Sequence, residues 1–164
     1  MSKIEVNEIA RRSGSSPISI PGHVIQTTQQ VYTTQTNITA TSFTSTGLTT
    51  SITPTSTSSK ILALVHLAVE VYQNGNTGYS VVYEIKRGST QIAKKYTNCY
   101  AGTASNGYYV IPVDGTMIFL DSPNTTSSTT YSVNAYLTAS ANSFTMRLNN
   151  QTGTSTLTLQ EIAQ

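Results

Sequence analysis

The strongest constraint on the fold lies in residues 60–72, where the sequence alternates with a period of two. The odd positions are apolar throughout: Ile61, Ala63, Val65, Leu67, Val69 and Val71. The even positions mix leucine and alanine with polar side chains. Successive side chains of a β-strand point to opposite faces of a sheet, so this pattern predicts a central strand. A helix is the alternative for a short apolar run, but the β-branched content and the missing charged face favour the strand.

Composition extends this prediction to the whole chain. Of 164 residues, 21 are serine and 29 are threonine, while only 10% are charged. Threonine is β-branched and fits pleated, half-exposed strands better than helices. Shorter alternating runs recur between turn signals, without an internal repeat of fixed length. These further strand regions are 24–35, 38–43, 48–53, 79–87, 90–96, 117–121, 129–137, 143–148 and 155–162. We therefore predict an all-β fold, a single β-sandwich or jelly roll of about 8–10 antiparallel strands over residues 24–164.

Residues 1–23 differ from the rest and are predicted to form an extended N-terminal arm. Several charges cluster near the start, and a weak alternation there suffices for one short strand. Two prolines then fix an extended path and remove backbone donors. The arm is expected to gain order on a neighbouring subunit or on a particle; a disordered tail is the alternative. The candidate docking residues are Ile4, Val6, Ile9, Arg11, Arg12, Pro17 and Pro21.

The residues that carry enzyme chemistry are not arranged for it. His66 and Glu70 are four apart, about 13 Å along a strand, which is too far to share a metal ion. Asp114 and Asp121 resemble a glycosidase pair only in type, because the first precedes a glycine in a turn and the second ends a strand. The sequence contains no Gly-x-Ser-x-Gly elbow and no glycine-rich phosphate motif. We expect no catalytic residues, no metal site and no cofactor.

Charge and cysteine content narrow the partners and the compartment. The net charge is +2, and the basic residues form pairs rather than runs, which argues against nucleic acid as a partner. The single cysteine, Cys99, excludes an internal disulfide and is consistent with assembly in a reducing bacterial cytoplasm. Residues 1–8 lack the apolar core of a signal peptide, and no stretch reaches the roughly 18 apolar residues of a membrane span. We expect no membrane insertion.

Tyrosine is the one enriched residue type with a binding character: the chain has ten, against three phenylalanines and no tryptophan. Segments 72–79 and 96–109 are rich in Tyr, Asn, Ser and Gly, and we predict both as loops. This mixture is typical of adaptable recognition surfaces for a glycan or a protein. Packing at a subunit contact or at the sandwich ends is the alternative. The candidate recognition residues are Tyr72, Asn74, Asn76, Tyr79, Tyr96, Tyr100, Asn106, Tyr108 and Tyr109.

Several segments together resemble a known group of proteins. They are 3–9 (KIEVNEI) with Gly14 and Pro17, 52–62 (ITPTSTSSKIL), 119–123 (FLDSP), 130–131 (TY) and 155–162 (STLTLQEI). This combination resembles a recurrent β-sandwich domain of phage virion proteins, found in tail fibres of cyanophages and other aquatic phages. The N-terminal segment is similar to the arm that precedes such domains.

The resemblance implies a virion structural protein, usually a homotrimer, at the tail or on the capsid surface. It implies no catalytic residues. The chain is short for a fibre, since it holds an arm and one domain. The leading hypothesis is a short tail-fibre or tail-attachment protein that docks by its arm and presents the sandwich to the host surface. Its partners would be itself, other virion proteins and a host-surface glycan or protein. A capsid decoration (cement) protein is the alternative, and a free carbohydrate-binding module is a further one.

Overall fold

The all-β prediction is confirmed. The computed structural model describes residues 20–74, 78–100, 108–140 and 144–164. In that part of the chain the regular elements are β-strands and one short 3-10 turn, η1 (Asn150–Thr152). The strands are β1 (Val24–Tyr32), β2 (Thr36–Ile38), β3 (Thr44–Ile52), β4 (Lys60–Leu67), β5 (Val69–Asn74), β6 (Gly78–Arg87), β7 (Thr90–Tyr100), β8 (Tyr108–Pro112), β9 (Gly115–Asp121), β10 (Thr129–Leu137), β11 (Thr145–Leu148) and β12 (Ser155–Ile162).

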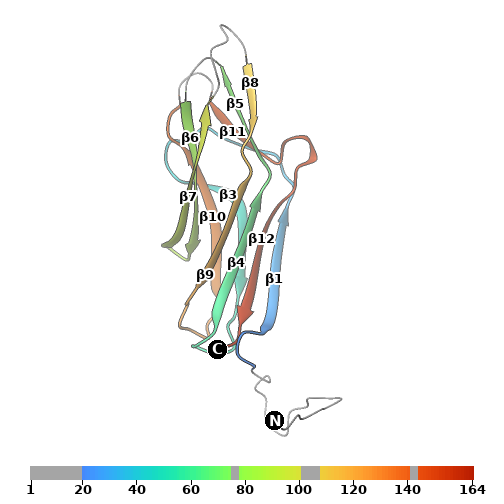
Figure 1. Cartoon of the computed structure of the whole chain (residues 1–164), viewed down its shortest axis with the longest axis vertical. Helices are drawn as coiled ribbons and strands as arrows, with labels where there is room; N and C mark the ends of the chain where they lie inside the picture. Colours follow the sequence, from blue (N-terminus) through green and yellow to red (C-terminus); the bar gives the residue numbers. More distant parts are fainter. Residues whose placement is uncertain (1–19, 75–77, 101–107, 141–143) are drawn as a thin grey trace, which may run out of the picture.

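Two of the three four-stranded sheets are the halves of one long layer. Their strand orders are β1-β12-β4-β9 and β2-β11-β5-β8. Each strand of one sheet continues along the chain into the strand at the same place in the other: β1 into β2, β4 into β5, β8 into β9 and β11 into β12. Four passes of the chain therefore form this layer, and all four are interrupted at its middle (Figure 1).

The third sheet, with the order β3-β10-β6-β7, forms the facing layer. If each interrupted pair is counted as one pass, the described strands make eight passes, which lie within the predicted range. In chain order the two layers then read 1-8-3-6 and 2-7-4-5, with antiparallel ladders throughout. Passes 1 and 8, 2 and 7, 3 and 6, and 4 and 5 are paired as neighbours, as in one long antiparallel hairpin that is rolled up into two layers. This arrangement is a jelly roll.

The prediction of a single strand over residues 60–72 is wrong at one position. The strand stops at Leu67 and resumes at Val69 in the other half of the layer. At Ala68 the backbone N–H donates to Ser155 Oγ (3.0 Å), and the carbonyl accepts from the backbone N–H of Asn149 (2.9 Å). The alternation runs on across this residue, because both halves bury their odd positions. A side-chain pattern does not report that the backbone leaves one ladder and enters another.

Asn149 satisfies backbone groups that the interruption leaves without ladder partners. It is buried and left-handed, with φ of 54°. Its Nδ2 donates to the carbonyls of Tyr32 (2.9 Å) and Thr34 (3.2 Å), where β1 ends. Its Oδ1 accepts from the hydroxyl of Ser155 (2.6 Å), which begins β12. Together with Ala68, these contacts connect the first, third and eighth passes at one level, and unpaired polar groups would be costly in this buried place.

The core lies between the two layers. The predicted inward side chains of β10 are fully buried: Tyr131, Val133, Ala135 and Leu137. They pack with the odd positions of β4 and with Val81 and Ile85 of β6. Burial raises the pKa of Tyr83, whose hydroxyl donates to the carbonyl of Val113 (3.0 Å) across the layers. The hydroxyl of Tyr83 thus keeps a partner in the core, as buried polar groups generally do.

Two buried carboxylates, those of Asp121 and Glu161, bind neighbouring groups at the end of the sandwich where β9 and β12 terminate. Arg87 lies 2.9 Å from Asp121, and the same carboxylate accepts from the hydroxyl of Tyr131 (2.7 Å). Burial of Glu161 alone would raise its pKa, but hydrogen bonds from Gln26, Ser59 and Thr55 outweigh that effect and lower it. Both acids therefore hold the fold together, and Asp121 is engaged in a structural ion pair.

We expect Asn149→Ala to lower the free energy of unfolding by about 2–4 kcal/mol, because it leaves buried carbonyls unpaired and places alanine in a left-handed conformation. Asn124→Ala is the matched control, since Asn124 is exposed and also left-handed (φ 53°). It should lose about 1 kcal/mol. Urea unfolding of both variants measures the difference. Equal losses would mean that the Asn149 contacts contribute nothing to stability.

Candidate functional site

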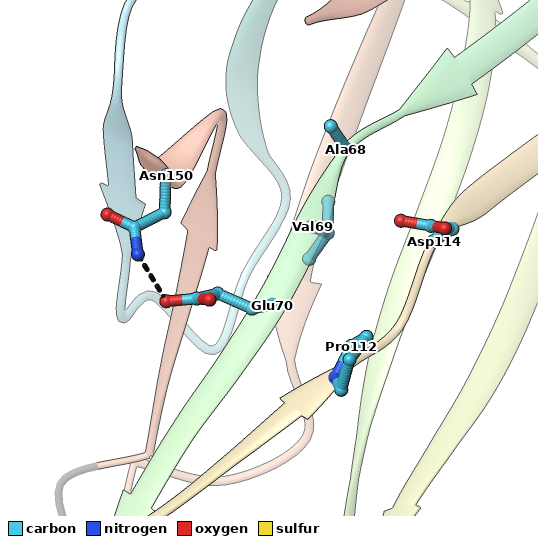
Figure 2. A pocket seen from close by; sticks show the side chains of 6 residues that line it. All are labelled: Ala68, Val69, Glu70, Pro112, Asp114 and Asn150. Carbon is cyan, nitrogen blue, oxygen red and sulfur yellow. Dashed lines mark hydrogen bonds between the residues drawn. The ribbon is translucent and has the colours of Figure 1, made fainter. Parts of the chain in front are cut away.

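A depression lies at the interruption of the long layer. It has a volume of about 190 Å³ and is lined by Ala68, Val69, Glu70, Pro112, Asp114 and Asn150. Glu70 accepts from Asn150 Nδ2 (2.6 Å) and from Arg147 (3.3 Å). Figure 2 shows Glu70 turned toward Asn150 and Asp114 on the far side of the β4–β5 strand. The two carboxylates do not converge on one point, as paired acid–base chemistry would require.

The outer face of the facing layer carries an aromatic row. The register places Tyr136 of β10 beside Val82 of β6, and Val82 beside Tyr96 of β7. Phe43, just before β3, meets Tyr136 edge-to-face, with ring centroids 4.7 Å apart. Val82 is buried although it points outward, because the rings cover it. Tyr96 is still 56% exposed, so the row ends in an accessible ring.

Lys94 lies above these rings. Its Nζ is 4.9 Å from the ring centroid of Tyr96, 5.7 Å from that of Phe43 and 5.9 Å from that of Tyr136. Such distances are those of cation–π contacts. In the register Lys94 faces Glu84, which is buried and accepts from Asn134 (2.9 Å). The only carboxylate of this hairpin is therefore buried opposite Lys94, and the ammonium group lies over the rings.

The phenol and the ammonium group perturb one another. A hydrogen bond with Tyr96 raises the pKa of Lys94, so the amine is protonated at neutral pH. The same hydrogen bond lowers the pKa of Tyr96, and a second one with Tyr136 acts in the same direction. The pKa of Tyr136 is raised, chiefly because it shares that hydrogen bond. The cluster is a connected network rather than three independent rings.

The row continues along β7 as a column of outward side chains. Lys94, Tyr96, Asn98 and Tyr100 occupy alternate positions and share one face of the strand. Tyr100 is 70% exposed, and its ring covers Gly78, its partner on β6. Asn98 accepts from the hydroxyl of Ser80 (2.7 Å). These four residues are called the β7 face below.

The middle of the outer face of the lower half of the long layer is different, because it carries no lysine, arginine or carboxylate; Lys60 lies at its end, where β4 begins, and its ammonium group donates to Ser122 Oγ (2.6 Å). The registers place twelve residues on it: Thr27, Gln29, Val31, Leu62, Leu64, His66, Thr116, Ile118, Leu120, Thr156, Thr158 and Gln160. Its aliphatic side chains gather on β4 and on the edge strand β9. Ile118 is 67% exposed and Leu120 is 53% exposed. We call these twelve residues the uncharged face.

The free edge of β9 is partly covered. The ammonium group of Lys95 reaches from β7 and donates to the carbonyl of Thr116 (3.2 Å). A lysine over an edge strand hinders the addition of a further strand there. The uncharged face is therefore offered through its side chains rather than through its backbone edge.

The predicted recognition residues that the structure describes lie in strands, although segments 72–79 and 96–109 were predicted as loops. Tyr72 is on the outer face of β5, stacked with Arg147 (4.2 Å), and Tyr79 packs against Phe144 (4.8 Å). Tyr96 and Tyr100 belong to β7. The strands simply extend further than their polar sequences indicate. Asn74, Tyr108 and Tyr109 are also strand residues, whereas Asn76 and Asn106 lie outside the described residues.

The candidate docking arm lies almost entirely outside the described residues; this holds for Ile4, Val6, Ile9, Arg11, Arg12 and Pro17. Pro21 is exposed in the turn before β1. There the N–H of Gly22 donates to the carbonyl of Ala163 (2.8 Å), and the N–H of Ala163 donates to the carbonyl of His23 (2.9 Å). The chain therefore enters the sandwich beside its last strand.

Sequence reasoning missed the partners that complete both faces. Phe43, Tyr136 and Lys94 come from three strand regions, and only the strand order brings them together. For the uncharged face, the sequence of β9 does contain a signal. Ile118 and Leu120 fall on the polar phase of their strand, opposite to Met117 and Asp121, which are buried.

Comparisons with known proteins give no family. No family model matches the sequence, and no curated protein matches it. Among solved structures the chain is similar to one described as the structure of infectious bursal disease virus Gt strain, with 12% identity and a TM-score of 0.32. The match covers 98% of this chain and 43% of that chain. A likeness at this TM-score carries no argument about function.

The described residues contain no helix with the length and hydropathy of a membrane span. They also contain no group of three or more histidine, cysteine or acidic side chains placed to share a metal ion.

We expect Lys94→Met to raise the pKa of Tyr96 toward its ordinary value of 10.0, because the variant removes the main cause of its lowering. The absorbance of the phenolate form, followed from pH 8 upward, should lose the contribution of one early-titrating tyrosine. Lys86→Met is the control, since it removes a positive charge from the same hairpin without touching the rings. Identical titration curves for the wild type and Lys94→Met would contradict the network.

Proposed function

We propose that this chain is a non-enzymatic structural protein of a virus particle that assembles through a sheet face and binds through its other surfaces. The observation that carries the proposal is the uncharged face. A soluble domain that has no partner seldom exposes a contiguous aliphatic patch with no charge among it. The finer proposal is a short tail-fibre or tail-attachment protein, a homotrimer docked by residues 1–23.

A second copy of this chain is the occupant that the face fits best. Two copies that pack on these twelve residues would bury no lysine, arginine or carboxylate, and Lys60 would stay at the rim. The four aliphatic side chains of β4 and β9 lie toward the free edge of the sheet, and threonine and glutamine residues of β12 and β1 flank them on the other side. Apolar contacts flanked by polar ones are usual at interfaces between protein chains.

The area of the face explains why the arm belongs in the proposal. Twelve residues on four strands cover about 400 Å², from the spacing of strands and residues in a sheet. A standard interface buries about 800 Å² on each partner. The remainder would come from residues 1–19, which precede the turn of Pro21 in the sequence and include Ile4, Val6 and Ile9.

The chemistry of the described residues favours binding over catalysis. Asp121 and Glu161 are committed to buried hydrogen bonds, and Glu70 is held by Arg147 and Asn150. His66 lies on the exposed uncharged face, on a different half of the layer from Glu70. These acids and His66 have structural partners or surroundings that do not suit proton transfer.

The link to a virus particle rests on the sequence resemblance and on the fold class. Jelly rolls are common in viral coat and lectin domains, although a fold alone does not determine a function. The exposed tyrosines of the facing layer favour a tail position, where a protein meets the host surface. A capsid decoration protein would use the same assembly face but has less reason for an exposed aromatic row.

We expect the pair Ile118→Thr and Leu120→Thr to dissociate the assembled full-length chain, because threonine keeps the strand but removes the apolar centre of the face. Light scattering of the wild type should give a multiple of the chain mass, and the variant should give the monomer. Val110→Thr is the control, since Val110 is an exposed aliphatic residue on β8 in the other half of the layer. A wild-type monomer, or a variant that stays assembled, would contradict the assembly face.

Deletion of residues 1–19 should abolish incorporation into particles of the virus that encodes the chain, while the contacts of Gly22 and His23 with Ala163 keep β1 in place. Antibody labelling of purified particles measures this. If only particles with the wild-type chain are labelled, adsorption assays then distinguish a position on the tail from one on the capsid. Excess soluble chain blocks host attachment for a tail protein but not for a decoration protein. Equal labelling of both would sink the role of the arm.

A further inference from the structure

We propose that the β7 face binds an acidic polysaccharide chain that lies along the strand. The inference deepens the proposed function, and rests on it, by naming the chemistry that the particle would recognise. It starts from Tyr96 and Tyr100, the most exposed aromatic residues of the described chain. Both point outward from one strand, on the layer opposite to the uncharged face.

The geometry suits an extended ligand. Tyr96 and Tyr100 are four residues apart, which is about 13 Å along a strand. Asn98 lies between them, and its amide is oriented by Ser80 (2.7 Å). Two rings with a hydrogen-bonding amide between them offer stacking surfaces and polar contacts in one line, which is the mixture that amphipathic sugar rings need.

The rings are held in advance of binding. Tyr96 is fixed by the ammonium group of Lys94 (4.9 Å to the ring centroid) and by its hydrogen bond with Tyr136. Phe43 supports Tyr136 edge-to-face. A ring that is already ordered loses little conformational freedom when a ligand stacks on it, and pre-organisation of this kind raises affinity.

Charge decides the class of saccharide. Of the cations in residues 78–100, Arg87 pairs with Asp121, Lys95 reaches β9, and Lys94 lies beside the rings. Because the one acid of this segment, Glu84, is buried, the exposed charge beside the rings is the positive charge of Lys94. An ammonium group has three donors, and Lys94 is exposed, so it can meet a sugar carboxylate beside the first ring.

The same features argue against a single-stranded nucleic acid as the ligand. Such ligands also stack on aromatic rings, but they carry a phosphate at every step and need a row of cations beside the rings. Beyond Lys94 the β7 face continues with Tyr96, Asn98 and Tyr100 and carries no further cation. A polysaccharide with carboxylates at wider spacing fits this sparse charge better.

The test is titration calorimetry of the full-length chain with polygalacturonate, alginate and hyaluronate. Fully methyl-esterified polygalacturonate serves as the neutral match, and oligo(dT) as the nucleic acid. We expect binding to at least one acidic polymer that weakens with salt. Tyr100→Ser and Lys94→Met should each weaken it by about tenfold or more. Tyr72→Ser should change it by less than about twofold, since Tyr72 lies on the other layer.

Several results would overturn the inference. They are no binding to any of the three acidic polymers, equal binding of the esterified polymer, tighter binding of oligo(dT), and unchanged affinity of Tyr100→Ser. Light scattering of the same samples keeps the two proposals apart. Loss of polysaccharide binding with intact assembly removes this inference alone, whereas a monomer that still binds through Tyr100 removes the assembly face and leaves the saccharide site.

Discussion

The hydrogen bonds of Asn149 and Ser155 are the constraint on which the rest of the structure depends. Four passes of the chain leave one ladder and enter another at the same level, and each change would strand backbone groups in a buried place. The side chain of Asn149 donates to the carbonyls of Tyr32 and Thr34, and its backbone N–H donates to the carbonyl of Ala68. The hydroxyl of Ser155 accepts from the N–H of Ala68. Because the layer is held at this line, its two halves can turn different outer surfaces to the solvent.

That division separates surface chemistries within a small domain. The lower half of the long layer carries the uncharged face, while the upper half carries Arg147 paired with Glu70 and stacked on Tyr72. The facing layer carries the aromatic row and Lys94. The uncharged face and the β7 face lie on opposite layers, so a neighbouring copy on one would not cover the other. Assembly and recognition are therefore compatible in one jelly roll.

The sequence predicted the fold class well, because period-two alternation is a local signal that each strand carries. The inward set of β10, from Tyr131 to Leu137, was read correctly for this reason. The prediction of one continuous strand failed at Ala68, because the apolar alternation continues there while the backbone hydrogen bonds change partners. The sequence also ended the predicted strand at Tyr96 and placed Tyr100 in a loop, since polar and aromatic residues near a turn do not show how far a strand extends.

The candidate site was predicted only in part. Enrichment in tyrosine pointed to Tyr96 and Tyr100, but their supporting residues come from other passes. Phe43 and Tyr136 join them only because β3, β10, β6 and β7 lie in that order, which is a property of the topology and not of any local pattern. The wrong-phase positions of Ile118 and Leu120 were readable in the sequence, yet their meaning depended on which neighbours shared their face.

Hydrogen exchange, measured at peptide resolution on the full-length chain in dilute and in concentrated solution, tests the central claim most directly. If copies associate through the uncharged face, backbone amides on the free edge of β9 should exchange more slowly in the concentrated sample, while those of β7 stay unchanged. Slower exchange in β7 with no change in β9 would show that copies meet on the aromatic face instead, and the account of two separate surfaces would be wrong.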